Sequence, residues 1–71
     1  MMTATYSVTY LRRKLAQARR DLAEANDQVA KHREIGDAGA LRFIVAWQAE
    51  ARRHERVIAA IETALADDTV R

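Results

Sequence analysis

The stretch EIGDAGAL, residues 34–41, decides the fold of this chain. It holds the only two glycines, Gly36 and Gly39, and the sequence contains no proline. Gly36 can adopt the left-handed conformation that often ends a helix, and the side chain of Asp37 can cap the start of another. We therefore predict a tight turn over residues 36–39 that joins two helices.

The segments on both sides of this turn are rich in Ala, Leu, Arg, Glu and Gln, which are strong helix formers. Apolar residues recur in each segment at alternating spacings of three and four, the heptad pattern of coiled-coil packing. We call these positions the inter-helix seam: Val8, Leu11, Leu15, Ala18, Leu22, Ala25, Val29 and His32 in the first segment, and Ala40, Ile44, Trp47, Ala51, His54, Ile58, Ile61 and Leu65 in the second. The pattern predicts an all-α fold, an antiparallel two-helix hairpin with coiled-coil-like packing.

The predicted chain is one helical-hairpin domain over residues 1–71, with helices at about residues 7–35 and 40–66 and a tail at 67–71. Residues 1–6 form an N-terminal arm, which the sequence leaves open between two conformations. The stretch ATYSVTY, residues 4–10, alternates apolar and hydroxyl residues, as an extended strand does. Ser7 or Thr9 can equally be the N-cap of the first helix, with a flexible lead before it.

Antiparallel folding about the turn places seam residues that are equidistant from it in one layer. The predicted layers are Leu11 with Leu65, Leu15 with Ile61, Ala18 with Ile58, Leu22 with His54, Ala25 with Ala51, and Val29 with Trp47. The same register predicts three polar pairs beside the seam: Arg12 with Glu62, Arg19 with Glu55, and Asn26 with Gln48. Such exposed pairs indicate register more than stability.

A chain of 71 residues without cysteine has a small core and no disulfide to support it, which favours self-association. The second helix carries another heptad row beside the inter-helix seam, apolar at both ends and charged in the middle. This second seam comprises Phe43, Ala46, Glu50, Arg53, Val57, Ala60 and Ala64, together with one edge of Trp47. We predict that it forms a homodimer, most simply a four-helix bundle, with Glu50 and Arg53 pairing across the twofold axis. The alanines Ala16, Ala23 and Ala30 offer an alternative face on the first helix.

The ionisable cluster around His54 raises the question of a metal or acid–base site. Glu50 lies one turn before His54, and the register brings Asp21 near the same flank. The spacing differs from the Glu-x-x-His motif of di-iron bundles, and His32 lies roughly 15 Å away along the hairpin. We expect His54 to be a seam histidine that bonds Asp21 or Glu50, and we predict no catalytic residues, no metal and no cofactor.

A nucleic-acid partner is the main alternative to a protein partner. The formal net charge is only +2, but arginines cluster on one half of the predicted rod. The candidate phosphate-binding residues are Arg12, Arg13, Arg19, Arg20, Arg52, Arg53 and Arg56. Interleaved carboxylates weaken this patch, because they repel phosphate and engage some of the arginines.

The sequence therefore predicts a small non-enzymatic module that associates with itself and binds another protein, as an adaptor, inhibitor or assembly component. A phage or mobile-element origin fits so short a chain. We expect a cytoplasmic location and no membrane partner, because the first residues show no basic leader and no apolar run is long enough to span a bilayer.

Overall fold

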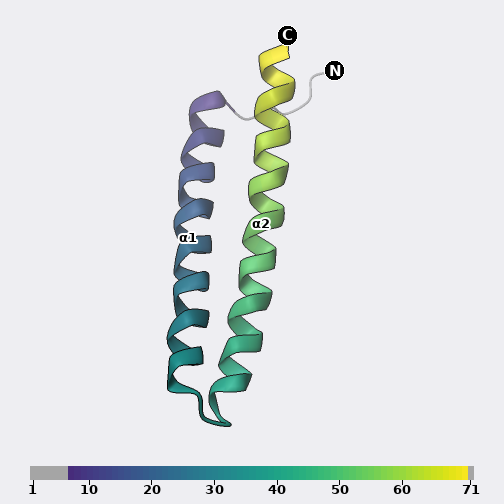
Figure 1. Cartoon of the computed structure of the whole chain (residues 1–71). Helices are drawn as coiled ribbons and strands as arrows, with labels where there is room; N and C mark the ends of the chain where they lie inside the picture. The colour runs from purple at the N-terminus through teal and green to yellow at the C-terminus, as the bar shows by residue number, and fades with distance from the viewer. Residues whose placement is uncertain (1–6, 71) are drawn as a thin grey trace.

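Two long helices lie side by side and run in opposite directions (Figure 1). The computed structural model describes residues 7–70, with the side chains of residues 7–67; helix α1 spans Val8–Ile35 and α2 spans Ala40–Val70. The molecule is a rod of 54 × 19 × 16 Å, with a radius of gyration of 16.1 Å where a compact domain of this length would have about 11 Å. The predicted all-α antiparallel hairpin is confirmed.

The turn between the helices has a cap on each side. Gly36 adopts the left-handed conformation, with φ 69° and ψ 13°, and its N–H donates to the carbonyl oxygen of His32 at 3.2 Å. The side-chain Oδ1 of Asp37 accepts the N–H of Ala40 at 2.8 Å, so Asp37 caps the first turn of α2. Both predicted capping roles are confirmed, and together they make the chain reverse direction here.

The two glycines of this turn should respond oppositely to alanine. Gly36→Ala should cost about 1 kcal/mol of unfolding free energy, because an L residue is strained at positive φ. Gly39 has no positive φ, and a Cβ there would lie at an ordinary 3.5 Å from Asp37 Oδ1. We expect Gly39→Ala to be neutral or to stabilise by about 0.5 kcal/mol through the unfolded state. Urea titration followed by circular dichroism measures both; equal losses would contradict the assignment of the cap.

The ends of the helices differ in part from the predicted limits. Ser7 is the N-cap of α1, since its Oγ accepts the N–H of Tyr10 at 3.0 Å. The strand alternative is thus wrong for residues 8–10, whereas the arm at residues 1–6 lies outside the described residues. The predicted tail at 67–71 is also wrong for residues 67–70, which continue α2 because no glycine or proline ends the helix there.

Burial follows the inter-helix seam. The buried residues of the described chain are all seam positions: Ala18, Ala25 and Val29 on α1, and Ala40, Ala51 and Ile61 on α2. Most of the larger seam side chains, such as Leu22 and Ile58, are only half-buried, and no large side chain among the described residues is fully buried. Two helices can enclose alanines between them, but they leave the edges of most leucines and isoleucines open to solvent.

The polar pairing beside the seam corrects the predicted register of side chains. Arg19 Nη2 bonds Glu62 Oε2 at 2.8 Å, so the predicted pairs of Arg19 with Glu55 and of Arg12 with Glu62 are wrong. Side chains lean toward the N-terminus of their own helix, and the two helices are antiparallel. Arg19 and Glu62 lean toward each other, whereas Arg19 and Glu55 lean apart. The predicted amide pair of Asn26 with Gln48 is likewise not formed.

This lean predicts where a second ion pair can be introduced. One heptad closer to the turn, Asn26 and Glu55 have the same relation as Arg19 and Glu62, and both are exposed. Asn26→Arg should therefore raise the unfolding free energy by about 0.5 kcal/mol, the usual value for an exposed pair. The same substitution in a Glu55→Gln background is the control, measured by urea titration at low and high salt. A gain that persists without the Glu55 carboxylate would refute the pairing.

Candidate interaction surface

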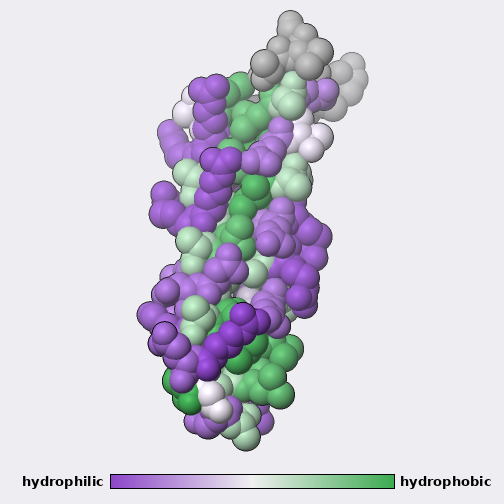
Figure 2. Space-filling view, viewed as in Figure 1, coloured by the Kyte–Doolittle hydropathy of each residue, from purple (hydrophilic) through white to green (hydrophobic). Residues whose placement is uncertain are grey.

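Exposed apolar side chains gather at the turn end of the rod, as the space-filling view shows (Figure 2). Four large ones are between 50% and 63% exposed: Ile35, Leu41, Phe43 and Val45. Most of the remaining visible surface is hydrophilic. Exposed apolar surface gathered at one end of a molecule usually marks a contact with another protein.

Phe43 is held in position by a neighbour across the turn. The ring of His32 stacks on the ring of Phe43, with centroids 5.0 Å apart and planes at 24°. His32 Nδ1 in turn lies 2.8 Å from the carbonyl oxygen of Gln28, which fixes the orientation of the imidazole. Beside the stack is an open hollow of about 250 Å³, lined by His32, Ile35, Asp37, Gly39, Ala40 and Phe43. The aromatic side chain is therefore oriented before any partner binds.

The second seam follows one side of α2 away from this end. Phe43 and Val57 are 50% and 40% exposed, and the alanines Ala46, Ala60 and Ala64 are exposed between and beyond them. Trp47 is half-buried, since it belongs also to the inter-helix seam. The alternative face, Ala16, Ala23 and Ala30, is exposed too but presents no large apolar side chain. The use of either face in a dimer stays a prediction.

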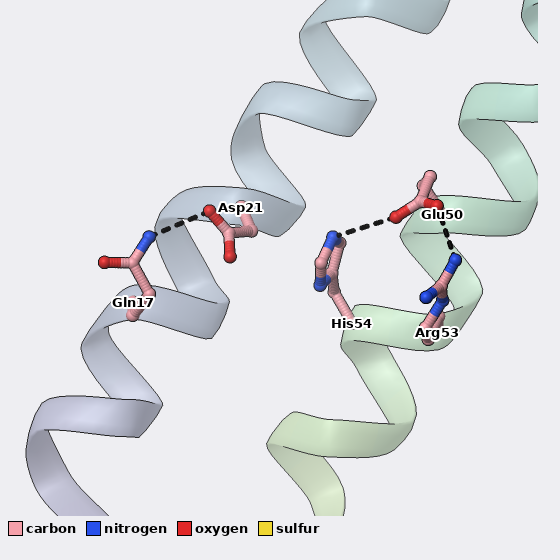
Figure 3. A network of polar contacts seen from close by, with 5 residues as sticks. All are labelled: Gln17, Asp21, Glu50, Arg53 and His54. Atoms are coloured by element: carbon pink, nitrogen blue, oxygen red, sulfur yellow. Dashed lines mark hydrogen bonds and ion pairs between the residues drawn. The ribbon is translucent and has the colours of Figure 1, made fainter.

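The charged middle of the second seam is a small network centred on Glu50 (Figure 3). Its Oε2 lies 2.6 Å from Arg53 Nη2, and its Oε1 lies 3.4 Å from His54 Nε2. Asp21, on α1, instead accepts a hydrogen bond from Gln17 Nε2 at 2.9 Å. Of the two predicted partners of His54, Glu50 is therefore the one that it contacts. Glu50 also pairs with Arg53 inside one helix, so pairing across a twofold axis would require the two to share or exchange partners.

The predicted phosphate-binding arginines are all exposed, but they differ in whether another side chain of the protein binds them. Three are engaged in the chain: Arg19 by Glu62, Arg53 by Glu50, and Arg20 by Gln17 Oε1 at 2.9 Å. The other four have no acidic partner within 4 Å among the described residues: Arg12, Arg13, Arg52 and Arg56.

The sequence reasoning missed part of the apolar end. Ile35, Leu41 and Val45 lie on neither predicted seam, yet they are the most exposed large apolar residues described. The signal was available in residues 40–47, ALRFIVAW, where only Arg42 is polar. A helical segment that is apolar on all sides is usually buried on all sides by other parts of the protein or by a partner. Since α1 covers just one side of it, the start of α2 indicates further contacts.

Neither a metal-ligand group nor a membrane-spanning helix within the described residues, nor a match to a known protein, points to a function. Within the described residues, no group of three His, Cys, Asp or Glu side chains could hold a metal ion. Neither helix, over its described length, is long and apolar enough to cross a membrane. Comparison with protein-family models, with curated proteins and with solved structures found no match.

Proposed function

We propose that this protein is a non-enzymatic interaction module, a helical hairpin that associates with itself and binds another protein as an adaptor, inhibitor or assembly component. The observation that carries the proposal is the cluster of exposed apolar side chains at the turn end. The cytoplasmic location expected from the sequence is part of the same proposal.

The limited core of the lone hairpin supports a need for partners. No large side chain among the described residues is fully buried, although 49% of the sequence is hydrophobic. Folds of this size seldom obtain more than about 3–5 kcal/mol from a single core and usually add a covalent, metal or subunit contribution. The sequence has no cysteine, so a disulfide cannot supply it. Subunit contacts through the open edges of the inter-helix seam can supply it.

Sedimentation equilibrium over a wide range of concentration tests the self-association. We expect the weight-average mass to rise from one chain toward two as concentration increases, and the melting temperature to rise with it, since association stabilises the folded state by mass action. A mass of one chain at every concentration would remove self-association from the proposal.

A nucleic-acid-binding role is the second candidate, and the four exposed arginines that have no acidic partner among the described residues favour it. Phosphate contacts release counterions, so affinity for duplex DNA or RNA should fall steeply as salt rises. Fluorescence polarisation with labelled duplexes at low and physiological salt measures this. We expect no salt-dependent binding from the protein-interaction module. Strong binding that is lost in Arg12→Gln/Arg52→Gln would instead favour the nucleic-acid role.

A further inference from the structure

Six positions of the second seam, from Phe43 to Ala60, have the same spacing when read in either direction along α2. From Phe43 to Ala60 its positions are separated by three, four, three, four and three residues, about a centre between Ala51 and Arg52. A twofold axis at this centre, perpendicular to the helix, superimposes the row on itself with its order reversed. Such an axis generates the isologous interface typical of homodimers.

The residue types on this row are complementary under that reversal. Phe43 falls opposite Ala60 of a second copy, and Ala46 falls opposite Val57, so each large side chain meets a small one. At the centre, Glu50 falls opposite Arg53 of the second copy. All six positions face solvent at least in part in the single chain and are therefore open to a partner.

We propose that two copies of this chain pair through the second seam with their α2 helices antiparallel, in the register that sets Phe43 on Ala60, Ala46 on Val57 and Glu50 on Arg53. This interface rests on the proposed self-association and names its face, direction and register. The large-to-small contacts provide apolar burial without steric overlap. If one helix shifted by a heptad relative to the other, Glu50 and Arg53 would no longer face each other. The charged centre therefore favours this register over the shifted ones.

Charge excludes the parallel arrangement of the same face. In a parallel pair every residue meets its own copy, so Glu50 would face Glu50 and Arg53 would face Arg53. Like charges facing each other in an interface suppress that pairing. In the antiparallel pair the two Glu50–Arg53 ion pairs, each 2.6 Å within its own helix, meet as two carboxylates and two guanidiniums in alternation. The proposed direction therefore places opposite charges next to each other at the axis.

The proposed dimer leaves one part of the apolar end uncovered. Leu41 precedes Phe43 by two residues, which places it about 200° away around the helix. Val45 lies on the same side as Leu41, and both are more than half exposed. Because the α2 helices are antiparallel, one Leu41–Val45 patch is presented near each end of the dimer. These two patches stay exposed in the proposed dimer.

Disulfide mapping tests the register, since the chain has no cysteine of its own. Ala46→Cys and Val57→Cys chains are mixed, refolded together and oxidised with a glutathione buffer, and the products are resolved by mass spectrometry. We expect a disulfide between position 46 of one copy and position 57 of the other. Each variant alone should stay reduced, because two copies of one position lie roughly 16 Å apart in this register, beyond the reach of a disulfide.

A matched control uses Ala59→Cys, an exposed alanine on the side of α2 away from the second seam. Mixed with Ala46→Cys, it should give no disulfide. A dominant 46–46 disulfide would show a parallel pair and overturn the proposal. A dimer in sedimentation without the 46–57 disulfide would overturn the face while self-association stands; a monomer in sedimentation would remove both.

Charge exchange between two chains tests the centre of the interface independently. Glu50→Arg alone and Arg53→Glu alone each place like charges at the axis, so each homodimer should weaken by at least about tenfold. When the two variants are mixed, opposite charges face each other again and a heterodimer should form with near wild-type affinity. Sedimentation of the separate and mixed chains measures this. Failure of the mixture to associate better than its components would contradict the Glu50–Arg53 contact.

Discussion

Phe43→Glu should convert the protein from a dimer to a monomer at micromolar concentrations. Phe43 is 50% exposed in the single chain and is oriented by the ring of His32, so the proposed interface buries an aromatic side chain that is already in place. Complete burial of an exposed phenylalanine contributes about 2 kcal/mol, so the exposed half of each Phe43 contributes about 1 kcal/mol. The twofold symmetry removes two such contributions, and each glutamate adds the cost of burying a charge. We expect the dissociation constant to rise at least 100-fold, a loss of about 3 kcal/mol or more.

The matched control is Leu41→Glu. Leu41 is even more exposed and lies in the same helical turn, but on the opposite side of α2. The substitution Leu41→Glu should leave the dissociation constant within about threefold of the wild type, a change in binding free energy of less than about 1 kcal/mol. Sedimentation equilibrium measures both variants, and circular dichroism checks that both remain helical. A dimer that tolerates glutamate at Phe43 but not at Leu41 would place the interface on the other side of α2.

Ala25→Leu should produce the largest loss of stability among conservative core changes. Ala25 is 0% exposed, and its predicted layer partner, Ala51, is also buried, so the two helices are close together here. Three additional carbons cannot fit unless the helices separate and weaken neighbouring contacts. Overpacking of this kind typically costs about 1–3 kcal/mol. In a domain of this size that lowers the melting temperature by roughly 5–20 °C.

Ala23→Leu provides the comparison, because the same substitution is made two residues away at an exposed position of α1. Its unfolding free energy should stay within about 0.5 kcal/mol of the wild type. Thermal and urea unfolding of both variants, at one protein concentration, give the difference. A stabilising effect of leucine at position 25 would reveal a void in this layer and would contradict close packing.

The turn and the seam could be predicted from sequence because their causes are local or periodic. Gly36 has a positive φ, which glycine tolerates without strain. Asp37 comes directly after it, and its carboxylate caps α2. The alternation of three and four matches the turn of a helix, so the apolar positions select one face. The buried residues Ala18, Ala25 and Ile61 lie on that face.

The pairs between helices could not be obtained from the same pattern. The heptad pattern indicates which backbone positions of the two helices lie at the same height. The partner of a long side chain also depends on the direction in which that side chain leans. Arg19 therefore bonds Glu62 in place of Glu55. The candidate site shows the same limit, because sequence placed His54 near both Asp21 and Glu50, and only packing decided for Glu50. The exposure of Leu41 and Val45 likewise depends on how little of α2 the single neighbour covers.

The sequence by itself determined that this chain folds back once, at residues 36–39, into two amphipathic helices, and which stripe of each helix faces the other. Those features depend on the conformation of single residues and on a repeat that any α-helix shares. The tertiary structure alone decided which charged side chains meet across the helices and how much apolar surface remains open at the turn end. These depend on how the side chains of two antiparallel helices lean relative to each other and on the area that a second helix can cover, and neither is a property of one helix taken alone.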